Sequence, residues 1–315
     1  MLALLALGAP GMAWAQTRTQ QARVSTLGVL TSTNPEPTLG FLREGLRALG
    51  WVEGKSLVIE VRSAEGKPNA LPGMVAELVR MKVDLIAAYL TPAVQAAKLA
   101  TNAIPIVMTG AGDPVATGLV ASLARPGGNI TGMSGTTAEL AAKNLEIVRE
   151  IRPGVSVVAV LANTADPFTK PFLGQLQLAG RAMNIEIRSV MMHGPEQYEA
   201  AFAELVKAKV DTVILQPSLP RKPAIDLALK HRLLLASPSL IFPRAGGLFA
   251  YAASPKDLAL KASVYVDKIL KGAKPSDLPI EQPTQFELVV NMKTAKALGI
   301  AIPRSVLVRA DEVIE

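Results

Sequence analysis

The sequence contains no cysteine and only two histidines among its 315 residues. The absence of cysteine excludes disulfides, thiol chemistry and cysteine-type metal sites. His193 falls in a predicted turn and His231 near the end of a predicted helix, and neither has a second histidine or a carboxylate at metal-ligand spacing. Metal-dependent and histidine-based nucleophilic mechanisms are therefore poorly supported, and we predict no metal site.

Aromatic residues and clusters of charge are also scarce. Phe, Trp and Tyr together make up 4% of the chain, and the net charge of +7 is spread along it rather than gathered in blocks. Proteins that bind nucleic acids usually combine a basic patch with interleaved aromatic side chains. The composition therefore argues against a nucleic-acid partner and favours a solvated, mildly basic surface.

The N-terminal stretch MLALLALGAPGMAWA, residues 1–15, contains no charge. It is shorter than the ~20 residues of a membrane span, and it ends in Ala13-Trp14-Ala15, a small-residue pattern typical of signal-peptidase sites. The basic segment that usually precedes such a stretch is missing. We predict a signal peptide over residues 1–15 and a periplasmic protein that is soluble or loosely associated with the membrane.

Beyond this stretch, short apolar runs alternate with segments of helical period. Half of the residues are hydrophobic, which allows a large core, and the length favours about two domains. Runs such as residues 157–161 and 213–215 are apolar on both faces, as in parallel strands covered by helices. The alternation restarts after Pro153 and predicts an α/β fold with two doubly wound parallel-sheet lobes.

The C-terminal part of the chain does not follow this alternation of strands and helices. A predicted helix over residues 255–272 is followed by a Pro-rich segment, a strand over 286–291 and a further helix. We expect the chain to return across the lobe boundary, so that several crossings form a hinge that closes over a ligand. The expected lobes are residues 24–153 plus 251–283, and residues 154–250 plus 284–315.

The segment IPIVMTGAGDP, residues 104–114, ends an apolar strand on Gly110-Ala111-Gly112 and then presents Asp113. A dinucleotide-binding turn, a catalytic acid and the wall of a ligand cleft are the three alternatives. Val115 occupies the place of the third glycine in G-x-G-x-x-G, and TGMSG (131–135) is one residue short of G-x-S-x-G. We therefore predict no cofactor and no enzymatic activity, and favour the cleft wall.

Small polar residues follow most of the predicted buried strands. Ligands of open α/β sheets bind outside the carboxyl ends of the strands, and in two facing lobes these ends converge on one cleft. Many hydrogen-bonding groups without a base–nucleophile pair suit the binding of a small polar molecule rather than its conversion. The predicted ligand-binding residues are Ser32, Thr33, Asn34, Thr91, Gly110, Asp113, Ser134, Asn163, Asp166, Phe168, Gln216, Ser218 and Tyr251.

Some of these residues have a structural alternative. Thr91 suits a helix N-cap, Asn163 and Asp166 suit Asx turns, and Tyr251 suits a packed position. As ligand groups, we expect Asp113 to accept hydrogen bonds from an amine or hydroxyl, and the helix start at Thr91 to take an acidic group. Thr109 and Thr164 also lie at strand ends.

Four segments of the chain resemble those of a known protein family. They are REGLRALGWVEGKSLVIEVRSAEG (43–66), IPIVMTGAGDPVATGLVASLARPGGNITGMSG (104–135), YVDKILKGAKPSDLPIEQPTQFELVVNMKTAKALGIAIP (265–303) and VLVRADEVIE (306–315). In this order they resemble the ABC-transporter substrate-binding proteins of the tryptophan/tyrosine-binding (TrpX-like) family. The resemblance extends from about residue 26 to the end.

This resemblance implies a type I periplasmic-binding fold, with two α/β lobes joined by three crossing segments. It implies delivery of a small solute to a membrane permease driven by a separate ATPase. We also predict that the protein is a monomer. Characterised relatives bind aromatic amino acids, so an amino acid or related carboxylate is expected. By the same resemblance, Thr91 and the loop around Asp113 line the first lobe, and Asn163 and the segment after Leu215 line the second.

Two segments depart from the family pattern. Related sequences often read SYGPD where this chain has AYAASPKD (250–257), and often carry an aspartate where it has QPSLP (216–220). The second departure removes a carboxylate that would recognise an amino group. Two other functions stay open: a racemase- or deaminase-like enzyme using Asp113, Asp166 and Tyr251, and a ligand sensor that feeds a membrane signalling partner.

Overall fold

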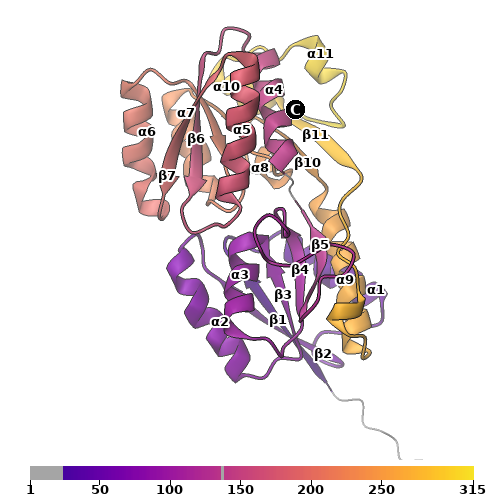
Figure 1. Ribbon diagram of the computed structural model, residues 1–315. Coiled ribbons are helices and arrows are strands. Elements are labelled where there is room, and N and C mark those ends of the chain that lie inside the picture. Colours follow the sequence, from indigo (N-terminus) through magenta and orange to yellow (C-terminus); the bar gives the residue numbers. More distant parts are fainter. Residues whose placement is uncertain (1–23, 136–137) are drawn as a thin grey trace, which may run out of the picture.

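The computed structural model describes residues 24–135 and 138–315, which form two α/β lobes, each built on one sheet (Figure 1). The predicted signal peptide lies outside these residues. The first sheet is entirely parallel, in the order β2-β1-β3-β4-β5. Its strands are β1 (Ser25–Thr31), β2 (Leu57–Ser63), β3 (Leu85–Tyr89), β4 (Ile106–Ala111) and β5 (Ile130–Ser134).

The second sheet has the order β12-β11-β10-β9-β8-β6-β7 and is parallel except between β10 and β11. Its strands are β6 (Val157–Asn163), β7 (Glu186–Met192), β8 (Thr212–Leu215), β9 (Leu234–Ala236), β10 (Phe249–Ala253), β11 (Phe286–Asn291) and β12 (Glu312–Ile314). The run β7-β6-β8-β9-β10 repeats the order of the first sheet. The prediction of two similar, doubly wound lobes is confirmed.

Helices cover both faces of the first sheet. They are α1 (Thr38–Ala48), α2 (Leu71–Arg80), α3 (Leu90–Ala100) and α9 (Pro255–Leu270). Leu30, Ile86 and Met108 pack into the core on the α2–α3 face, while Val29 and Val107 pack into the core on the α1–α9 face. Because both faces are buried, the strands read as continuous apolar runs.

The second sheet is covered in the same way, by α4 (Ala138–Ile151), α5 (Thr169–Met183), α6 (Tyr198–Lys207), α7 (Arg221–His231), α8 (Ile241–Arg244), α10 (Met292–Leu298) and α11 (Arg304–Leu307). Phe172 and Phe249 lie in one core, and Tyr198 and Phe202 in the other. Among the described residues, no helix combines the length and apolar composition needed to cross a membrane.

Helix α9 returns to the first lobe and lies beside α1 (Figure 1). Gly45 permits this close approach, because a Cβ there would overlap the Ser263 side chain. The Trp51 indole N–H donates to Asp267 Oδ1 at 2.9 Å and ties the α1–β2 loop to the same helix. The first lobe is therefore completed by a segment about two hundred residues away in sequence.

The lobe boundaries differ from those expected at 153/154 and 250/251. Helix α4 belongs to the second lobe, because Leu145 and Val148 lie in the core with Phe172. Strand β10 also belongs there, paired with β11. The chain thus crosses between Ser134 and Ala138, at Ser254, and between Glu281 and Phe286, which includes the expected 283/284 position. Apolar periodicity alone does not reveal which sheet a helix packs against.

Candidate functional site

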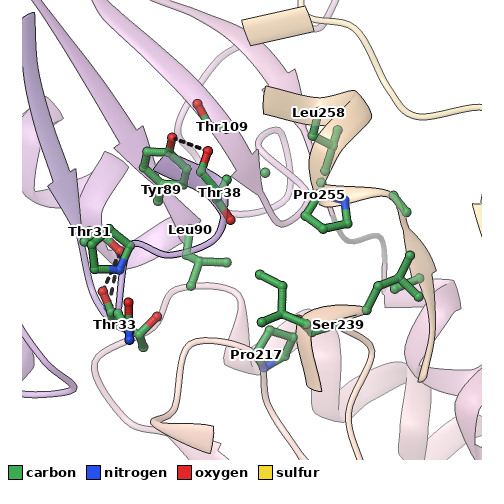
Figure 2. Close-up of a pocket in the computed structure, with 18 of the residues that line it drawn as sticks. Thr31, Thr33, Thr38, Tyr89, Leu90, Thr109, Pro217, Ser239, Pro255 and Leu258 are labelled. Carbon is green, nitrogen blue, oxygen red and sulfur yellow. Dashed lines mark hydrogen bonds between the residues drawn. The ribbon is translucent and has the colours of Figure 1, made fainter. Parts of the chain in front are cut away.

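The two lobes enclose a pocket of about 750 Å³, part of which is open to solvent. Figure 2 shows Thr31, Thr33, Tyr89, Leu90 and Thr109 on one side, with Pro217 and Ser239 across from them. The lining residues are Thr31, Thr33, Asn34, Pro35, Thr38, Tyr89, Leu90, Thr109, Gly110, Gly135, Pro217, Arg221, Pro238, Ser239, Leu240, Ile241, Ala252, Ala253, Pro255 and Leu258. A concave space between two lobes, lined mostly by apolar groups with a few polar ones, is typical of ligand sites.

The first-lobe wall is built where the parallel strands end. Thr31 and Thr33 lie at the end of β1, Tyr89 at the end of β3, and Thr109 at the end of β4. Strands β1 and β3 are neighbours, and the direction of winding reverses between them. Such a reversal point is the usual ligand position in doubly wound sheets, because the loops leave to opposite faces and open a crevice.

Leu90 joins β3 to α3 with φ of 65°, in the left-handed region that costs a bulky residue free energy. The turn is held partly by Thr91, whose Oγ1 accepts a hydrogen bond from Gly112 N at 2.9 Å. Thr91 is therefore not the N-cap that its sequence position suggests; Tyr89 occupies that position. The strained turn places the Leu90 side chain in the pocket wall.

The hydroxyl of Thr109 is a buried polar group of the pocket wall. The residue is 4% exposed, and its Oγ1 has no hydrogen bond to the described part of the chain. A buried unpaired hydroxyl costs free energy that a hydrogen bond recovers. The neighbouring Tyr89 hydroxyl donates to Thr38 O over 3.5 Å, a long bond, and burial raises the pKa of Tyr89 (Figure 2).

Arg221 supplies the positive charge of the lining. It is the first residue of α7, is half-buried, and its Nη2 donates to Glu36 O of the first lobe at 3.1 Å. Burial lowers its pKa, and the negative charge of Glu65 opposes that effect. Within the described ranges, the bond to Glu36 O is the hydrogen bond that the Arg221 guanidinium makes.

A smaller pocket adjoins the first and shares Leu90, Gly110 and Pro217 with it. Its remaining lining residues are Thr91, Gly112, Asp166, Phe168 and Ser218. Asp166 is 5% exposed; its Oδ1 accepts from Phe168 N at 2.9 Å and its Oδ2 from Gln216 Nε2 at 2.8 Å. Burial raises the pKa of Asp166 to about 6, and the hydrogen bonds it accepts oppose that rise.

Seven of the thirteen predicted site residues line these pockets. Thr33, Asn34 and Gly110 line the larger one; Thr91, Asp166, Phe168 and Ser218 line the smaller one. Ser32, Asp113, Ser134, Asn163, Gln216 and Tyr251 line neither.

The side chains of Asp113 and Tyr251 make contacts outside the pockets. Asp113 has φ of 37°, and its Oδ1 accepts from Ala116 N at 3.2 Å, so the carboxylate caps its own loop. The Tyr251 ring packs against Phe286, with 6.1 Å between centroids. The Tyr251 backbone exchanges two hydrogen bonds with the buried Asn144 amide. Neither side chain therefore faces the pocket.

Of the other four residues, Asn163, Ser134 and Gln216 make hydrogen bonds within their own lobe, and the Ser32 hydroxyl makes none to the described residues. Gln216 Oε1 accepts from Asn163 N at 2.8 Å and from Thr169 Oγ1 at 2.9 Å, which joins the ends of β6 and β8. Ser134 Oγ donates to Ala111 O over 3.4 Å. Ser32 is buried and its Oγ lacks a partner within the described ranges.

Sequence reasoning missed several lining residues, including Tyr89, Leu90, Arg221 and Ser239. Tyr89 and Leu90 end an apolar run that reads as core, although their place at a strand end was a usable signal. Arg221 opens a helix after a loop, and nothing in the local sequence separates it from a surface arginine. Its position in the lining depends on how the lobes meet.

The family model for the ABC transporter substrate binding protein matches residues 36–314. The chain is 28% identical over 268 residues to a tyrosine-binding protein of Clostridioides difficile (strain R20291), which covers 83% of this chain and 76% of that protein. The sequence resemblance to substrate-binding proteins is thus confirmed by an independent comparison.

Solved structures share the fold. A conserved domain protein of Vibrio cholerae matches with a TM-score of 0.84 and 25% identity, over 92% of this chain and all of that one. A domain from Streptococcus pneumonia in complex with L-Trp matches with a TM-score of 0.83 and 24% identity, over 93% and 100%. A ligand-free, open substrate-binding protein of Clostridium difficile matches with a TM-score of 0.60 and 24% identity, over 92% and 99%.

Proposed function

The chain belongs to the ABC transporter substrate-binding protein family, and from this premise we infer that the pocket between its lobes is where it holds the solute. One observation carries the assignment to this pocket: a buried, unpartnered Thr109 hydroxyl and the Arg221 guanidinium line the same space at the strand ends. Free hydrogen-bonding groups inside a largely apolar pocket are typical of a ligand site.

We propose an amino acid or related carboxylate as the solute. Arg221 suits a carboxylate, because a guanidinium and a carboxylate form paired hydrogen bonds. Leu90, Ile241 and Leu258 offer an apolar surface for the rest of the molecule. A tyrosine-binding relative and a fold relative in complex with L-Trp support this size and class.

The proposed contact residues are those of the larger pocket, including the predicted Thr33, Asn34 and Gly110. Thr91, Asp166, Phe168 and Ser218 line the adjoining smaller pocket, and we propose that they support the ligand site without contacting the ligand. We propose a binding role without catalysis.

Binding is proposed to close two bodies, residues 24–135 plus 255–283 and residues 138–253 plus 284–315. Contacts across the cleft, such as Arg221 with Glu36, support a closed arrangement in this structure. The higher TM-score to the L-Trp complex than to the open, ligand-free structure agrees with it. A ligand that touches both lobes would shift the population towards this form.

The proposal places the protein outside the cytoplasm, in the periplasm, after export directed by residues 1–15. As a monomer it would deliver its solute to a membrane permease that is driven by a separate ATPase. Family membership supports the transporter partner.

A thermal-shift screen of purified protein against amino acids, small carboxylates and nucleosides tests the proposed function. A ligand at 100 times its Kd adds about 2.7 kcal/mol of stability and raises Tm. Ser239→Trp is the matched variant, since it fills the pocket from a half-buried position of the second lobe. We expect it to fold like wild type and to lose the ligand-induced shift. A shift that survives in Ser239→Trp would place binding elsewhere.

A further inference from the structure

The side chains of the larger pocket carry positive charge and no negative charge. Among the described residues, its lining contains one arginine, Arg221, and no aspartate, glutamate or histidine. The other polar side chains are the hydroxyls of threonine, serine and Tyr89, and the amide of Asn34. An α-amino acid presents both a carboxylate and an ammonium group, so this lining has a charged partner for only one of them.

Arg221 is suited to an external anion, because the acidic groups near it are engaged elsewhere. Glu36 accepts from Gly40 N and forms an ion pair with Arg43 at 3.7 Å. Glu65 is exposed and accepts from Ser63 Oγ. Across residues 24–135 and 138–315, Arg221 forms no ion pair; its recorded bond goes to the Glu36 carbonyl. A half-buried guanidinium stays charged and favours a carboxylate.

The buried carboxylate of Asp166 lines the smaller pocket and not the larger one. Both of its oxygens already accept hydrogen bonds, from Phe168 N and Gln216 Nε2. The second-lobe side of the larger pocket presents Pro238, Leu240 and Ile241, and the Ser239 hydroxyl there is an uncharged acceptor. An ammonium group there would lose hydration with only uncharged acceptors of the described lining residues to replace it, at a site that already holds a guanidinium.

Building on the proposed function, we propose that the pocket selects a carboxylic acid with an apolar or aromatic body and no ammonium group. Arg221 pairs with the carboxylate, Leu90, Ile241 and Leu258 contact the body, and Thr109 Oγ1 hydrogen-bonds a polar substituent. The substrate class is the deaminated counterpart of an aromatic amino acid.

Calorimetry with matched ligand pairs tests this specificity. The pairs are L-tyrosine with 3-(4-hydroxyphenyl)propanoate, and L-tryptophan with 3-(indol-3-yl)propanoate. Each pair differs only in the ammonium group. We expect the deaminated acid to bind at least tenfold more tightly in both pairs. Equal or tighter binding of the amino acids overturns the inference.

A second comparison separates charge recognition from a structural role of Arg221, which also bridges the lobes through Glu36 O. We measure the ratio of the Kd of the primary amide of 3-(4-hydroxyphenyl)propanoate to the Kd of the acid. We expect this ratio to be at least ten in wild type and near one in Arg221→Gln. Lys222→Gln is the control, because the neighbouring Lys222 is exposed and pairs with Asp226. It keeps the wild-type ratio. An unchanged ratio in Arg221→Gln overturns the inference.

The outcomes also separate this inference from the proposed function. Tighter binding of L-tyrosine or L-tryptophan than of the deaminated acids, abolished by Ser239→Trp, would overturn the inference and leave the proposed function standing. No Tm shift for any compound in wild type would overturn both.

Discussion

Phe168 of the second lobe lies directly against Gly112 of the first, so that a Cβ on Gly112 would be 2.6 Å from Phe168 Cγ. A similar contact occurs at Gly66, where a Cβ would overlap the ring of Pro220. Both glycines belong to strand-end loops of the first lobe, and both partners to the second lobe. The absence of a side chain at these positions therefore allows the lobes to approach as closely as they do.

Gly112→Ala is expected to weaken ligand binding roughly tenfold, or about 1.4 kcal/mol. The added methyl group would meet the Phe168 ring only when the lobes are closed, so it penalises the closed form. The free energy of unfolding without ligand should change little, because each lobe keeps its own core. Calorimetry with the solute from the screen measures the affinity, and small-angle scattering measures the opening.

Gly73→Ala is the matched control, since nothing lies within 4 Å of a Cβ built there. It should bind like wild type. Wild-type affinity in Gly112→Ala would show that the contact with Phe168 does not limit closure.

Thr109→Val replaces the unpartnered hydroxyl by a methyl group of similar size. The unliganded protein should unfold with an unchanged or slightly higher free energy, because no hydrogen bond is lost. Ligand affinity should fall roughly fivefold, which corresponds to one hydrogen bond of about 1 kcal/mol. Urea denaturation and calorimetry check the two effects separately.

Thr131→Val is the contrasting variant. Thr131 Oγ1 donates to Leu278 O at 2.8 Å, and its removal leaves that carbonyl without this donor. It should lose about 1–3 kcal/mol of stability and keep its affinity. A similar loss of stability in Thr109→Val would show that the Thr109 hydroxyl is already hydrogen-bonded in the unliganded protein, which would contradict its proposed role in ligand binding.

Asp166 should make stability depend on pH. Its pKa is about 6 in the folded protein, above the ordinary value of 3.8, so the folded state binds more protons than the unfolded state between these values. The free energy of unfolding therefore falls as the pH rises from about 4 to about 6, by up to about 3 kcal/mol from this group. Denaturation of wild type and Asp166→Asn across this window measures the difference in slope.

The other carboxylates contribute equally to the pH dependence of unfolding free energy in wild type and in Asp166→Asn. Their contribution therefore cancels when the two slopes are compared. Asp226→Asn, on the exposed side of α7, controls for the loss of a carboxylate as such. Parallel pH profiles for wild type and Asp166→Asn would contradict the prediction.

Asp113→Ala should leave ligand affinity within about twofold of wild type, because the carboxylate caps its loop through Ala116 N and does not line the pocket. Loss of the cap should cost about 1 kcal/mol of stability. Asp113→Asn keeps an acceptor oxygen and should retain most of that stability. A large loss of ligand affinity in both variants would show that the Asp113 carboxylate contacts the ligand.

The architecture could be predicted because its signals are local. Runs such as β3 and β6 are apolar on both faces, and the helices between them bury regularly spaced residues such as Leu39, Leu42 and Leu46. Repetition of this unit predicts a parallel, doubly wound sheet. The placement of α4 and β10 could not be read in this way, because their apolar faces would suit either lobe.

The site was predictable only in part, for a related reason. Strand ends are visible in the sequence, and that rule predicted Thr33, Asn34 and Gly110, which line the larger pocket. The direction of each side chain is not visible: Asp113 turns back to its own loop, and Tyr251 packs on Phe286. Arg221 lines the pocket because the packing of the two lobes places the start of α7 beside Glu36 of the first lobe.

The sequence by itself determined that the chain folds as two α/β lobes with polar strand ends, because apolar periodicity and turn residues act over a few neighbours. It also carried the family resemblance. Only the tertiary structure decided which strand-end groups meet, since that depends on contacts between segments far apart in sequence. Gly112 against Phe168, and Arg221 beside Glu36, exist because two separately folded lobes pack across one cleft.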